Sequence, residues 1–402
     1  MKVLYLINYK YIYHINLKLK VLHLSEYGLP DYRIEKSAIT GLNYGYRVFF
    51  AGMSSPEFTN NSKIFEKIYQ LDWPWPEPNY PKKLYIPYIL LGKTSIWNAV
   101  KKQIKKILEE LRPDIVHAHN LASAKLVSEL DVPMIYNDHE YWSISIKSLY
   151  ESKMLNNGQK LSKKKTLAYK RIIKIWSKWE SDIVSKYPTL VVSKTIANEM
   201  KQKYSNKFFL LPNYPMKNET SISHIPEFHK DLNSVYAGNE PLKASVFAPH
   251  RNITELDQVF NENDIGKVIF LGRTSFQPTD KVICKGLLSR SEMYNEMSKC
   301  SIGLLPMKKF WSHKYMNPNK TVEYAHAGLH VISTSSFSDV IETLDNNCTT
   351  IEDYNDLINH LKYFQDNKEE LYKKRIKIFN FAKEKLNWEQ YEGNIIKCYK
   401  SI

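Results

Sequence analysis

The amino-acid sequence predicts an α/β protein with two Rossmann-like domains that face each other across a cleft. Short apolar runs alternate with longer amphipathic stretches along residues 18–212, and the same alternation recurs after residue 213. Strands that alternate with helices are typical of βαβ units, in which helices cover both faces of a parallel sheet. The length of 402 residues suits two domains of this kind.

The first half contains four strand-like runs separated by helical stretches. Pro113 ends one helix directly before a strand, and Gly45 follows another helix where helices favour glycine. The expected strands are residues 20–24, 47–51, 114–118 and 133–136, and the expected helices are residues 33–43, 97–111 and 122–130. Residues 1–17 are either an additional strand or an extension ahead of the first one, and the sequence leaves both open.

The second half repeats the pattern of elements without repeating the sequence. Pro212 and Pro215 interrupt both periodic patterns, which places the domain boundary near residue 213. Two such sheets would bind ligands in the cleft between them, at the carboxyl ends of their strands. The expected strands are residues 234–237, 267–271, 300–305 and 330–334.

Composition narrows the class of protein. Lys and Arg total 57 against 42 Asp and Glu, and the net charge of +15 suits either an anionic partner or a merely Lys-rich composition. The four cysteines lack zinc-ligand or redox spacing, which favours a reducing cytoplasm over a disulfide scaffold. No segment approaches the roughly 20 apolar residues of a transmembrane helix, and none reads as a signal peptide. P-loop and standard nicotinamide-site glycine motifs are also missing.

Six segments carry the most specific motifs. Taken together, these segments resemble the family 4 retaining glycosyltransferases, which have the GT-B fold. They occur in the same order as in that family, and they cover the chain from about residue 18 to its end. The segment Asn317–Ile332 is the most specific of them. The others are Leu24–Ile34 with Gly45–Val48, Arg112–His119, Pro133–Glu140, Thr189–Lys194 with Leu211–Pro215, and Asn387–Gln390.

The resemblance implies transfer of a sugar from a nucleotide-diphosphate sugar to an acceptor, with retention of anomeric configuration. The acceptor would be a glycan, a lipid-linked molecule or a small molecule. Residues 1–213 would form the acceptor-binding domain, residues 214–386 the nucleotide-sugar-binding domain, and residues 387–402 a helix that packs back on the first domain. The nucleotide sugar is a co-substrate, and the resemblance implies no further cofactor and no catalytic metal.

The donor site is expected around the helix that follows Pro318. Glu323 is expected to hold the ribose as a catalytic-site carboxylate, although a first-turn carboxylate can also simply stabilise its own helix. Asn319 and Lys320 lie at the helix N-terminus, whose backbone N–H groups and dipole favour phosphate. Gly28 lies in the first loop, where the backbone would approach the donor or acceptor closely.

Two departures from the family pattern affect this site. The family often has a second glutamate eight residues before Glu323, where this chain has Tyr315. The sugar contact would then be the phenol hydroxyl, a backbone N–H of residues 311–317, or absent. The usual Arg/Lys pair after the first strand of the second domain is also missing, which leaves Arg251, Arg273 and Lys320 as the candidate cations for the diphosphate.

On the opposite side of the cleft, His139 follows a predicted strand and is expected to contact the donor sugar, as the resemblance implies. It could equally be a structural hydrogen-bond hub beside Asp138 and Glu140. These two carboxylates and His119 are expected on the acceptor side. His117 and His119 share a face of a regular strand, and we expect His119 to face the cleft. A metal bound by these clustered side chains is disfavoured because no D-x-D pair occurs.

Basic residues concentrate in one predicted amphipathic helix at residues 160–179. Its tryptophans and lysines fit two interpretations. The helix either lies peripherally on the inner face of an anionic membrane, or it packs its apolar stripe on the domain and leaves the lysines solvated. Aromatic residues at 73–88 extend this expectation. No motif for nucleic-acid binding accompanies the charge.

Two other functions remain open. A sugar-nucleotide 2-epimerase has the same fold, but no acid/base pair for the sugar C2 is identifiable in the sequence. A catalytically weak nucleotide-sugar-binding or scaffold protein would fit Tyr315 and the missing Arg/Lys pair.

Overall fold

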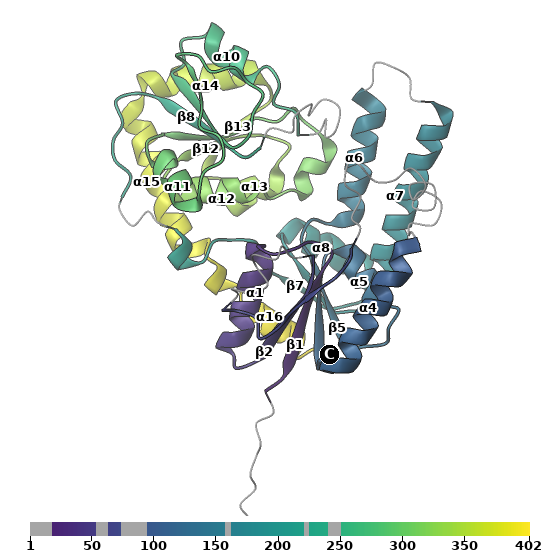
Figure 1. The fold of residues 1–402 in the computed structure, drawn as a ribbon. Coiled ribbons are helices and arrows are strands. Elements are labelled where there is room, and N and C mark those ends of the chain that lie inside the picture. Colours follow the sequence, from purple (N-terminus) through teal and green to yellow (C-terminus); the bar gives the residue numbers. More distant parts are fainter. Residues whose placement is uncertain (1–17, 54–62, 74–94, 157–161, 221–224, 240–250) are drawn as a thin grey trace, which may run out of the picture.

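The computed structural model describes residues 18–53, 63–73, 95–156, 162–220, 225–239 and 251–402. The question of whether residues 1–17 add a strand therefore lies outside the described residues, as do most of the aromatic residues at 74–88. Two α/β halves stand one above the other, with the second half at the upper left of Figure 1.

The first half is built on a parallel sheet of seven strands in the order β3-β2-β1-β4-β5-β6-β7. Its central strands are fully buried because helices cover both faces, as the continuous apolar runs predicted. The strands are β1 (Lys20–Ser25), β2 (Arg47–Gly52), β3 (Ile68–Gln70), β4 (Ile115–His119), β5 (Met134–Asp138), β6 (Thr189–Val191) and β7 (Phe208–Leu210).

Side-chain caps set where several of the connecting helices begin. Asp31 accepts a hydrogen bond from the backbone of Arg33, and Ser193 accepts one from Ile196, which satisfies N–H groups that a helix leaves free in its first turn. The helices are α1 (Tyr32–Asn43), α4 (Ser95–Leu111), α5 (Leu121–Val127), α6 (Trp142–Asn156), α7 (Lys163–Val184) and α8 (Lys194–Lys203).

The second half has a parallel sheet of six strands in the order β10-β9-β8-β11-β12-β13. The strand order reverses between β8 and β11, and such a reversal opens a crevice at the carboxyl ends of the strands. The strands are β8 (Asn233–Ala237), β9 (Lys267–Leu271), β10 (Val282–Cys284), β11 (Ile302–Leu305), β12 (His330–Thr334) and β13 (Cys348–Ile351). The predicted fold class, two parallel α/β domains, is confirmed.

Helices and short 3-10 turns complete this half. Gly328 has φ +70° just after α12, so a glycine suits the end of that helix. The helices are α10 (Leu256–Glu262), α11 (Arg290–Ser298), α12 (Asn319–His326), α13 (Ser338–Thr343), α14 (Tyr354–Asp366) and α15 (Lys368–Lys385), and the 3-10 turns are η1 (Lys217–Glu219), η3 (Trp311–Tyr315) and η4 (Trp388–Gln390).

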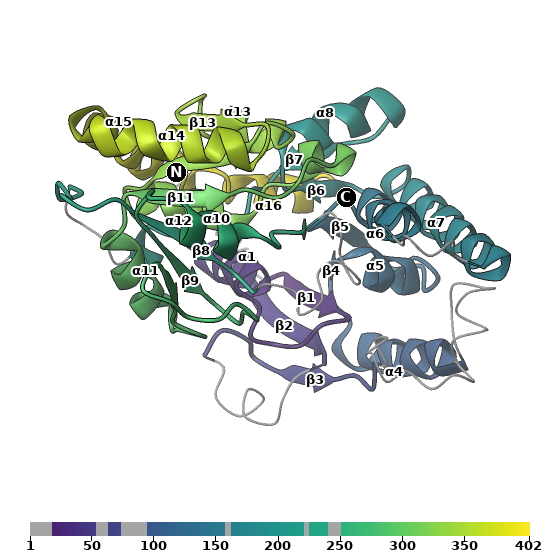
Figure 2. The same ribbon diagram turned by 90° about the horizontal axis from the view of Figure 1, so that it is seen from above.

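The end of the chain returns to the first half, as expected. Helix α16 (Gly393–Tyr399) packs against β6, β7 and α1, and it lies beside the first sheet in Figures 1 and 2, where it is drawn in yellow. Trp388 Nε1 donates to Thr40 Oγ1 at 3.0 Å, and the Tyr399 hydroxyl lies 2.8 Å from His117 Nδ1. The buried Ile395 and Ile396 cover the face of the sheet opposite α5 and α7.

Helices α6 and α7 pack side by side and extend beyond the first sheet (Figure 1). The expectation that the tryptophans of this segment face a membrane is wrong, because Trp176 and Trp179 are buried against Trp142 and Trp97 in the core of the first half. The apolar stripe of α7 therefore packs on the domain. Within the described residues, no helix is both long enough and apolar enough to cross a membrane.

Candidate functional site

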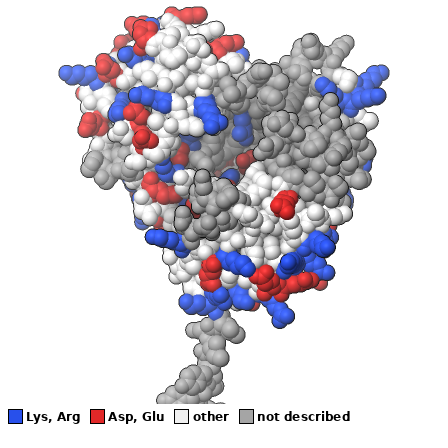
Figure 3. Space-filling view, viewed as in Figure 1, with Lys and Arg blue, Asp and Glu red and all other residues white. Residues whose placement is uncertain are grey.

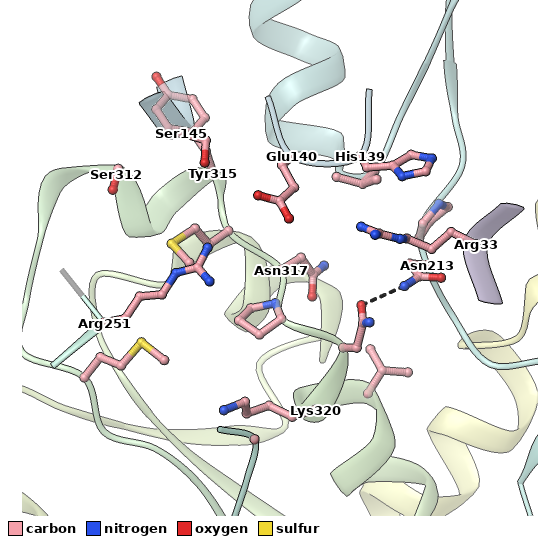
Figure 4. Close-up of a pocket in the computed structure, with 18 of the residues that line it drawn as sticks. Arg33, His139, Glu140, Ser145, Asn213, Arg251, Ser312, Tyr315, Asn317 and Lys320 are labelled. Carbon is pink, nitrogen blue, oxygen red and sulfur yellow. Dashed lines mark hydrogen bonds between the residues drawn. The ribbon is translucent and has the colours of Figure 1, made fainter. Parts of the chain in front are cut away.

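A cavity of about 450 Å³ lies between the two halves, at the carboxyl ends of their strands. His139 and Glu140 follow β5 on one side, and Gly238 and Asn239 follow β8 on the other. Figure 3 shows the molecule hollowed between its two lobes, with basic side chains inside the hollow. Figure 4 shows the side chains of both halves converging on the cavity. The predicted residues that line it are His139, Glu140, Arg251, Tyr315, Asn319 and Lys320.

Lys320 projects from the start of α12 toward the end of β8. Its Nζ lies 3.7 Å from the centroid of the Tyr236 ring, a cation–π contact that holds the ammonium at the cavity wall. Gly238 makes this position available, because a Cβ there would lie 2.8 Å from Lys320 Nζ. Gly238 also has φ +133°, a conformation that other residues rarely adopt.

Asn319, at the first position of the same helix, is tied to the first half. Asn213 Nδ2 donates to Asn319 Oδ1 at 3.0 Å, and a dashed line at Asn213 marks this hydrogen bond in Figure 4. Asn213 Oδ1 in turn accepts from the ammonium of Lys36 at 2.9 Å. The N-terminus of α12 is therefore held against α1 through a single asparagine side chain.

The two candidate arginines differ. Arg251 lines the cavity, and its buried Nε has no hydrogen-bond partner among the described residues. Arg273 is exposed and lies outside the cavity lining, and only its backbone N–H is tied to the site, by a 2.8 Å hydrogen bond to Asn239. The geometry therefore favours Arg251 over Arg273 as a cation for an anion in the cavity.

Glu323 lies on α12, three residues after Lys320, and is not among the residues that line the cavity. Its Oε1 is 3.4 Å from Arg290 Nη1, and its side chain is 14% exposed. Burial raises the pKa of Glu323, whereas the cationic side chains of Arg290 and Lys36 act in the opposite direction. Burial also lowers the pKa of Lys36 to about 8, so this small cluster is held largely out of water.

Tyr315 lines the cavity, but its hydroxyl donates to the carboxylate of Glu199 on α8 of the other half. The Tyr141 hydroxyl donates to the other oxygen of Glu199 at 3.0 Å, and the rings of Tyr141 and Tyr315 meet edge to face. Tyr315 therefore joins the two halves, and its hydroxyl is committed to a protein partner.

The five predicted residues of the first half differ in whether they reach the cavity. Glu140 is exposed into the cavity, and His139, which is 6% exposed, lines it beside Arg33 (Figure 4). The expectation that His119 and Asp138 face the cleft is wrong, because both are fully buried. Burial raises the pKa of Asp138 to about 7, and its Oδ1 accepts from the Tyr136 hydroxyl at 2.9 Å. Gly28 lies in the loop after β1, outside the cavity lining.

His23, His117 and His119 form one group among the described residues that could hold a metal ion. One nitrogen of each ring lies within 4.8 Å of the others, but five of the six ring nitrogens already have hydrogen-bond partners, the exception being His23 Nε2. His23 Nδ1 lies 3.0 Å from His119 Nε2, and His117 Nε2 lies 3.1 Å from Asn137 Nδ2. An ion would have to break these hydrogen bonds, so the donor set does not favour a metal.

Sequence reasoning missed Arg33, Lys36 and Asn213. Arg33 belongs to the first motif, and its guanidinium is oriented by the carboxylate of Asp31 at 2.9 and 3.1 Å. Asn213 lies in the segment Leu211–Pro215, which was read as a domain boundary. The position of Asn213 within a motif expected next to the cleft could have indicated that it belongs to the site.

Comparison with known proteins supports the resemblance. The family model described as Glycosyltransferase Family 4 matches residues 53–213. A search of curated proteins finds no match.

Solved structures match over nearly the whole chain. Sucrose-phosphate synthase from Thermosynechococcus elongatus has a TM-score of 0.67 at 12% identity, covering 96% of this chain and 99% of that one. Anabaena HepE in complex with UDP and glucose has a TM-score of 0.64 at 11% identity, covering 96% and 100%. A putative UDP-N-acetylglucosamine 2-epimerase from Listeria monocytogenes has a TM-score of 0.53 at 11% identity, covering 91% and 94%. The chain therefore has the GT-B fold.

Proposed function

We propose that this chain is a retaining glycosyltransferase that uses a UDP-sugar as donor. The observation that carries the proposal is the interdomain cavity, which the second half lines with Arg251, Lys320 and the start of α12. Solved structures of the same fold contain UDP or UDP-glucose, which favours a uridine nucleotide over other bases.

The diphosphate would lie between Lys320, Arg251 and the N-terminus of α12. Free backbone N–H groups and the positive end of a helix dipole favour a phosphate there. Charge-assisted hydrogen bonds from an ammonium and a guanidinium would add to this attraction in a site partly screened from water. These two cations would take the place of the missing Arg/Lys pair after β8.

Glu323 would accept hydrogen bonds from the ribose hydroxyls. It lies on the same helix as Lys320, and its ion pair with Arg290 is long enough, at 3.4 Å, to leave the carboxylate acceptor capacity. On the other side of the cleft, His139 would contact the donor sugar. Glu140, an exposed carboxylate with no hydrogen bond or ion pair to other described residues, would meet hydroxyls of the acceptor.

Retention would follow from a reaction on one face of the sugar. The bond between the anomeric carbon and the leaving phosphate oxygen would break as the acceptor oxygen bonds to the same face. The acceptor proton would pass to the departing phosphate. The role of the chain would be to orient the two substrates and to stabilise charge on the diphosphate, which requires no protein nucleophile and no metal.

A donor panel tests this function. Calorimetry with UDP-, GDP-, ADP- and dTDP-sugars, followed by incubation with sugar acceptors, should show binding of a UDP-sugar and a glycoside with the anomeric configuration of the donor. An inverted product would overturn retention, and failure to bind any nucleotide sugar would overturn the function.

A second candidate is a nucleotide-sugar-binding scaffold. It is favoured by the Tyr315 hydroxyl, which bonds to Glu199 where the family often has a sugar-binding glutamate. The same panel separates the two, because a scaffold would bind the donor without transfer or hydrolysis. A 2-epimerase would instead change the configuration of the sugar at C2 without an acceptor.

The exposed face of α7 would meet an anionic membrane on the cytoplasmic side. Residues 163–178 contain seven Lys or Arg and no Asp or Glu. Most of these cations lie opposite the buried face of Ile172 and Trp176, around the 70%-exposed Leu167. Basic side chains appear at the outer end of this helix in Figure 3. Such a face would bring a lipid-linked acceptor to the cleft.

A further inference from the structure

A line of polar side chains leads from the interior of the first half to the cavity. The Lys36 ammonium on α1 donates to Asn213 Oδ1 at 2.9 Å and to the Tyr214 carbonyl at 2.6 Å. Asn213 Nδ2 in turn donates to Asn319 Oδ1 at 3.0 Å. Lys36 is 4% exposed and is not among the residues that line the cavity, whereas both asparagines line it. The line therefore begins in the core and ends at the proposed donor site.

The direction of these hydrogen bonds is fixed at the Lys36 end. Because an ammonium can only donate, the atom of Asn213 that faces it has to be the carbonyl oxygen. The amide NH2 of Asn213 then faces Asn319, and the atom of Asn319 that accepts from it has to be Oδ1. The NH2 group of Asn319 remains, and no side chain or carbonyl of the described residues accepts a hydrogen bond from it.

A free NH2 group suits the ligand expected at this place. Asn319 is an exposed residue at the first position of α12, directly before Lys320, and both residues line the cavity. Phosphate oxygens only accept hydrogen bonds when they are ionised, so an amide NH2 can bind them. The opposite orientation of the Asn319 amide would turn its carbonyl oxygen toward the phosphate, which would repel it.

Lys36 lies where both segments that join the two halves pass. The first segment supplies Asn213 and the Tyr214 carbonyl as acceptors. From the second segment, the ring of Trp388 lies with its centroid 4.9 Å from Lys36 Nζ, a cation–π contact. The Trp388 backbone N–H also donates to the Pro215 carbonyl at 2.9 Å, which ties the two segments together. These contacts hold the ammonium in place at the beginning of the line.

The charges around Lys36 oppose one another. Glu219 of η1 and Glu323 of α12 favour the protonated amine. Arg290 of α11 and Arg33 of α1 disfavour it. Burial is the largest influence, and it lowers the pKa of Lys36 to about 8. The amine therefore loses its proton just above physiological pH, and a neutral amine can accept a hydrogen bond as well as donate one. The neighbouring amide is then no longer held in one orientation.

We propose that Lys36 is a positioning residue of the donor site, whose ammonium orients the amides of Asn213 and Asn319 so that Asn319 Nδ2 donates to an oxygen of the bound diphosphate. The inference rests on the proposed function, which supplies the diphosphate. Lys36 acts on the ligand only through Asn213, whereas Asn319 contacts the ligand itself.

Calorimetric titration of the full chain with UDP at pH 7 tests the line. Asn319→Ala removes the donor, and Lys36→Met keeps the length of the side chain while it removes the ammonium. Each change should weaken UDP binding by roughly tenfold, as expected for a hydrogen bond to a charged group. The double variant should bind UDP no more weakly than either single variant, because both changes remove the same contact.

Lys383→Met is the matched control. Lys383 is also a partly buried lysine near the segments that join the two halves, but its ammonium donates to Thr220 Oγ1, at 3.0 Å. This variant should bind UDP like the unmodified protein. A loss equal to that of Lys36→Met would overturn the positioning role, because it would follow from removal of any lysine beside these segments.

The pH dependence of UDP binding provides a readout that a merely structural role would not change. The protonated form of Lys36 is the competent one, so the affinity of the unmodified protein should fall as the pH rises from 7 to 9, through the pKa of about 8. Asn319→Ala should bind UDP more weakly at pH 7 and should lack this fall. Because Asn319 is exposed, this comparison also serves if Lys36→Met does not fold.

Three results would overturn the proposal. They are unchanged UDP affinity in Asn319→Ala, losses that add in the double variant, and an equally steep fall with pH in Asn319→Ala. In each case UDP binding to the unmodified protein would leave the proposed function standing. If the unmodified protein does not bind UDP at all, the proposed function and this inference fall together.

Discussion

The hydroxyl of Tyr315 donates a hydrogen bond to Glu199, which connects the wall of the cavity in the second half to helix α8 of the first. Ser148 and Ser312 form a second connection nearby, with 2.6 Å between their hydroxyl oxygens. Both contacts come from the turn at Trp311–Tyr315 and hold the two halves together beside the cavity, so the position expected to bind the sugar instead helps to set the width of the cleft.

Tyr315→Phe tests this assignment. Loss of one hydrogen bond to a carboxylate should lower the free energy of unfolding by about 1–2 kcal/mol, while the affinity for UDP should change little. Urea unfolding and calorimetry measure the two effects. Tyr44→Phe, at an exposed tyrosine, is the control. A larger loss of sugar-nucleotide affinity than of stability would return Tyr315 to the donor site.

Glu323→Ala tests the ribose contact. Removal of a carboxylate that accepts ribose hydroxyls should weaken donor binding by roughly 1–3 kcal/mol. Glu219→Gln is the matched control, because Glu219 Oε2 also lies near Arg290, at 3.9 Å. If both substitutions weaken donor binding equally, the loss comes from the disturbed surroundings of Arg290. Unchanged donor affinity in Glu323→Ala would remove Glu323 from the site.

The buried histidines predict the acid sensitivity of the fold. His23 and His139 have pKa values lowered to about 3 by burial, against 6.5 in the unfolded chain, so the unfolded state binds more protons between these values. Their contribution to stability is complete above pH 6.5 and is lost as the pH falls toward 3. Each ring contributes a slope of up to about 1.4 kcal/mol per pH unit.

Unfolding at pH 7.5, 6, 5 and 4 checks this expectation. The unmodified protein should lose stability on acidification, and His23→Phe should lose it less steeply. Phe228→Leu, at an exposed side chain that carries no ionisable group, is the control and should leave the slope unchanged. Equal slopes for the unmodified protein and His23→Phe would contradict the buried neutral state of His23.

The basic face of α7 predicts binding to anionic vesicles. Replacement of Lys164, Lys170 and Lys174 by Gln should weaken binding to phosphatidylglycerol vesicles by about 1 kcal/mol per lysine at low salt. The matched control is the same change at Lys102, Lys105 and Lys106 on α4, which are also exposed. If both triple variants lose the same amount of vesicle binding, the binding depends on the overall charge of the protein and α7 has no specific role.

Periodicity and turn residues were sufficient to predict the two sheets and most central strands, because those strands are short apolar runs between helical stretches. They could not show which side chains reach the cleft. His117 and His119 do share a face of β4, and their rings stack at 4.1 Å. In a sheet covered on both faces, however, that face is also buried, and alternation alone cannot reveal this.

Residues whose environment depends on the other half were the least predictable. Lys36 reads as one more lysine on an amphipathic helix, yet it is 4% exposed because Asn213 and the Tyr214 carbonyl, about 177 residues away, accept its hydrogen bonds. Tyr315 could be matched to a family position, but Glu199, 116 residues distant, determines what its hydroxyl does. Only the packing of the two halves provides these partners.

Calorimetric titration of UDP into the unmodified protein and into Lys320→Met is the most direct test of the donor site. The account predicts that UDP binds and that Lys320→Met weakens binding by roughly tenfold or more, because a charge-assisted hydrogen bond to the diphosphate is lost. Lys377→Met, at an exposed lysine of α15, should bind UDP normally. The absence of UDP binding to the unmodified protein, or equal affinity in Lys320→Met, would contradict the account.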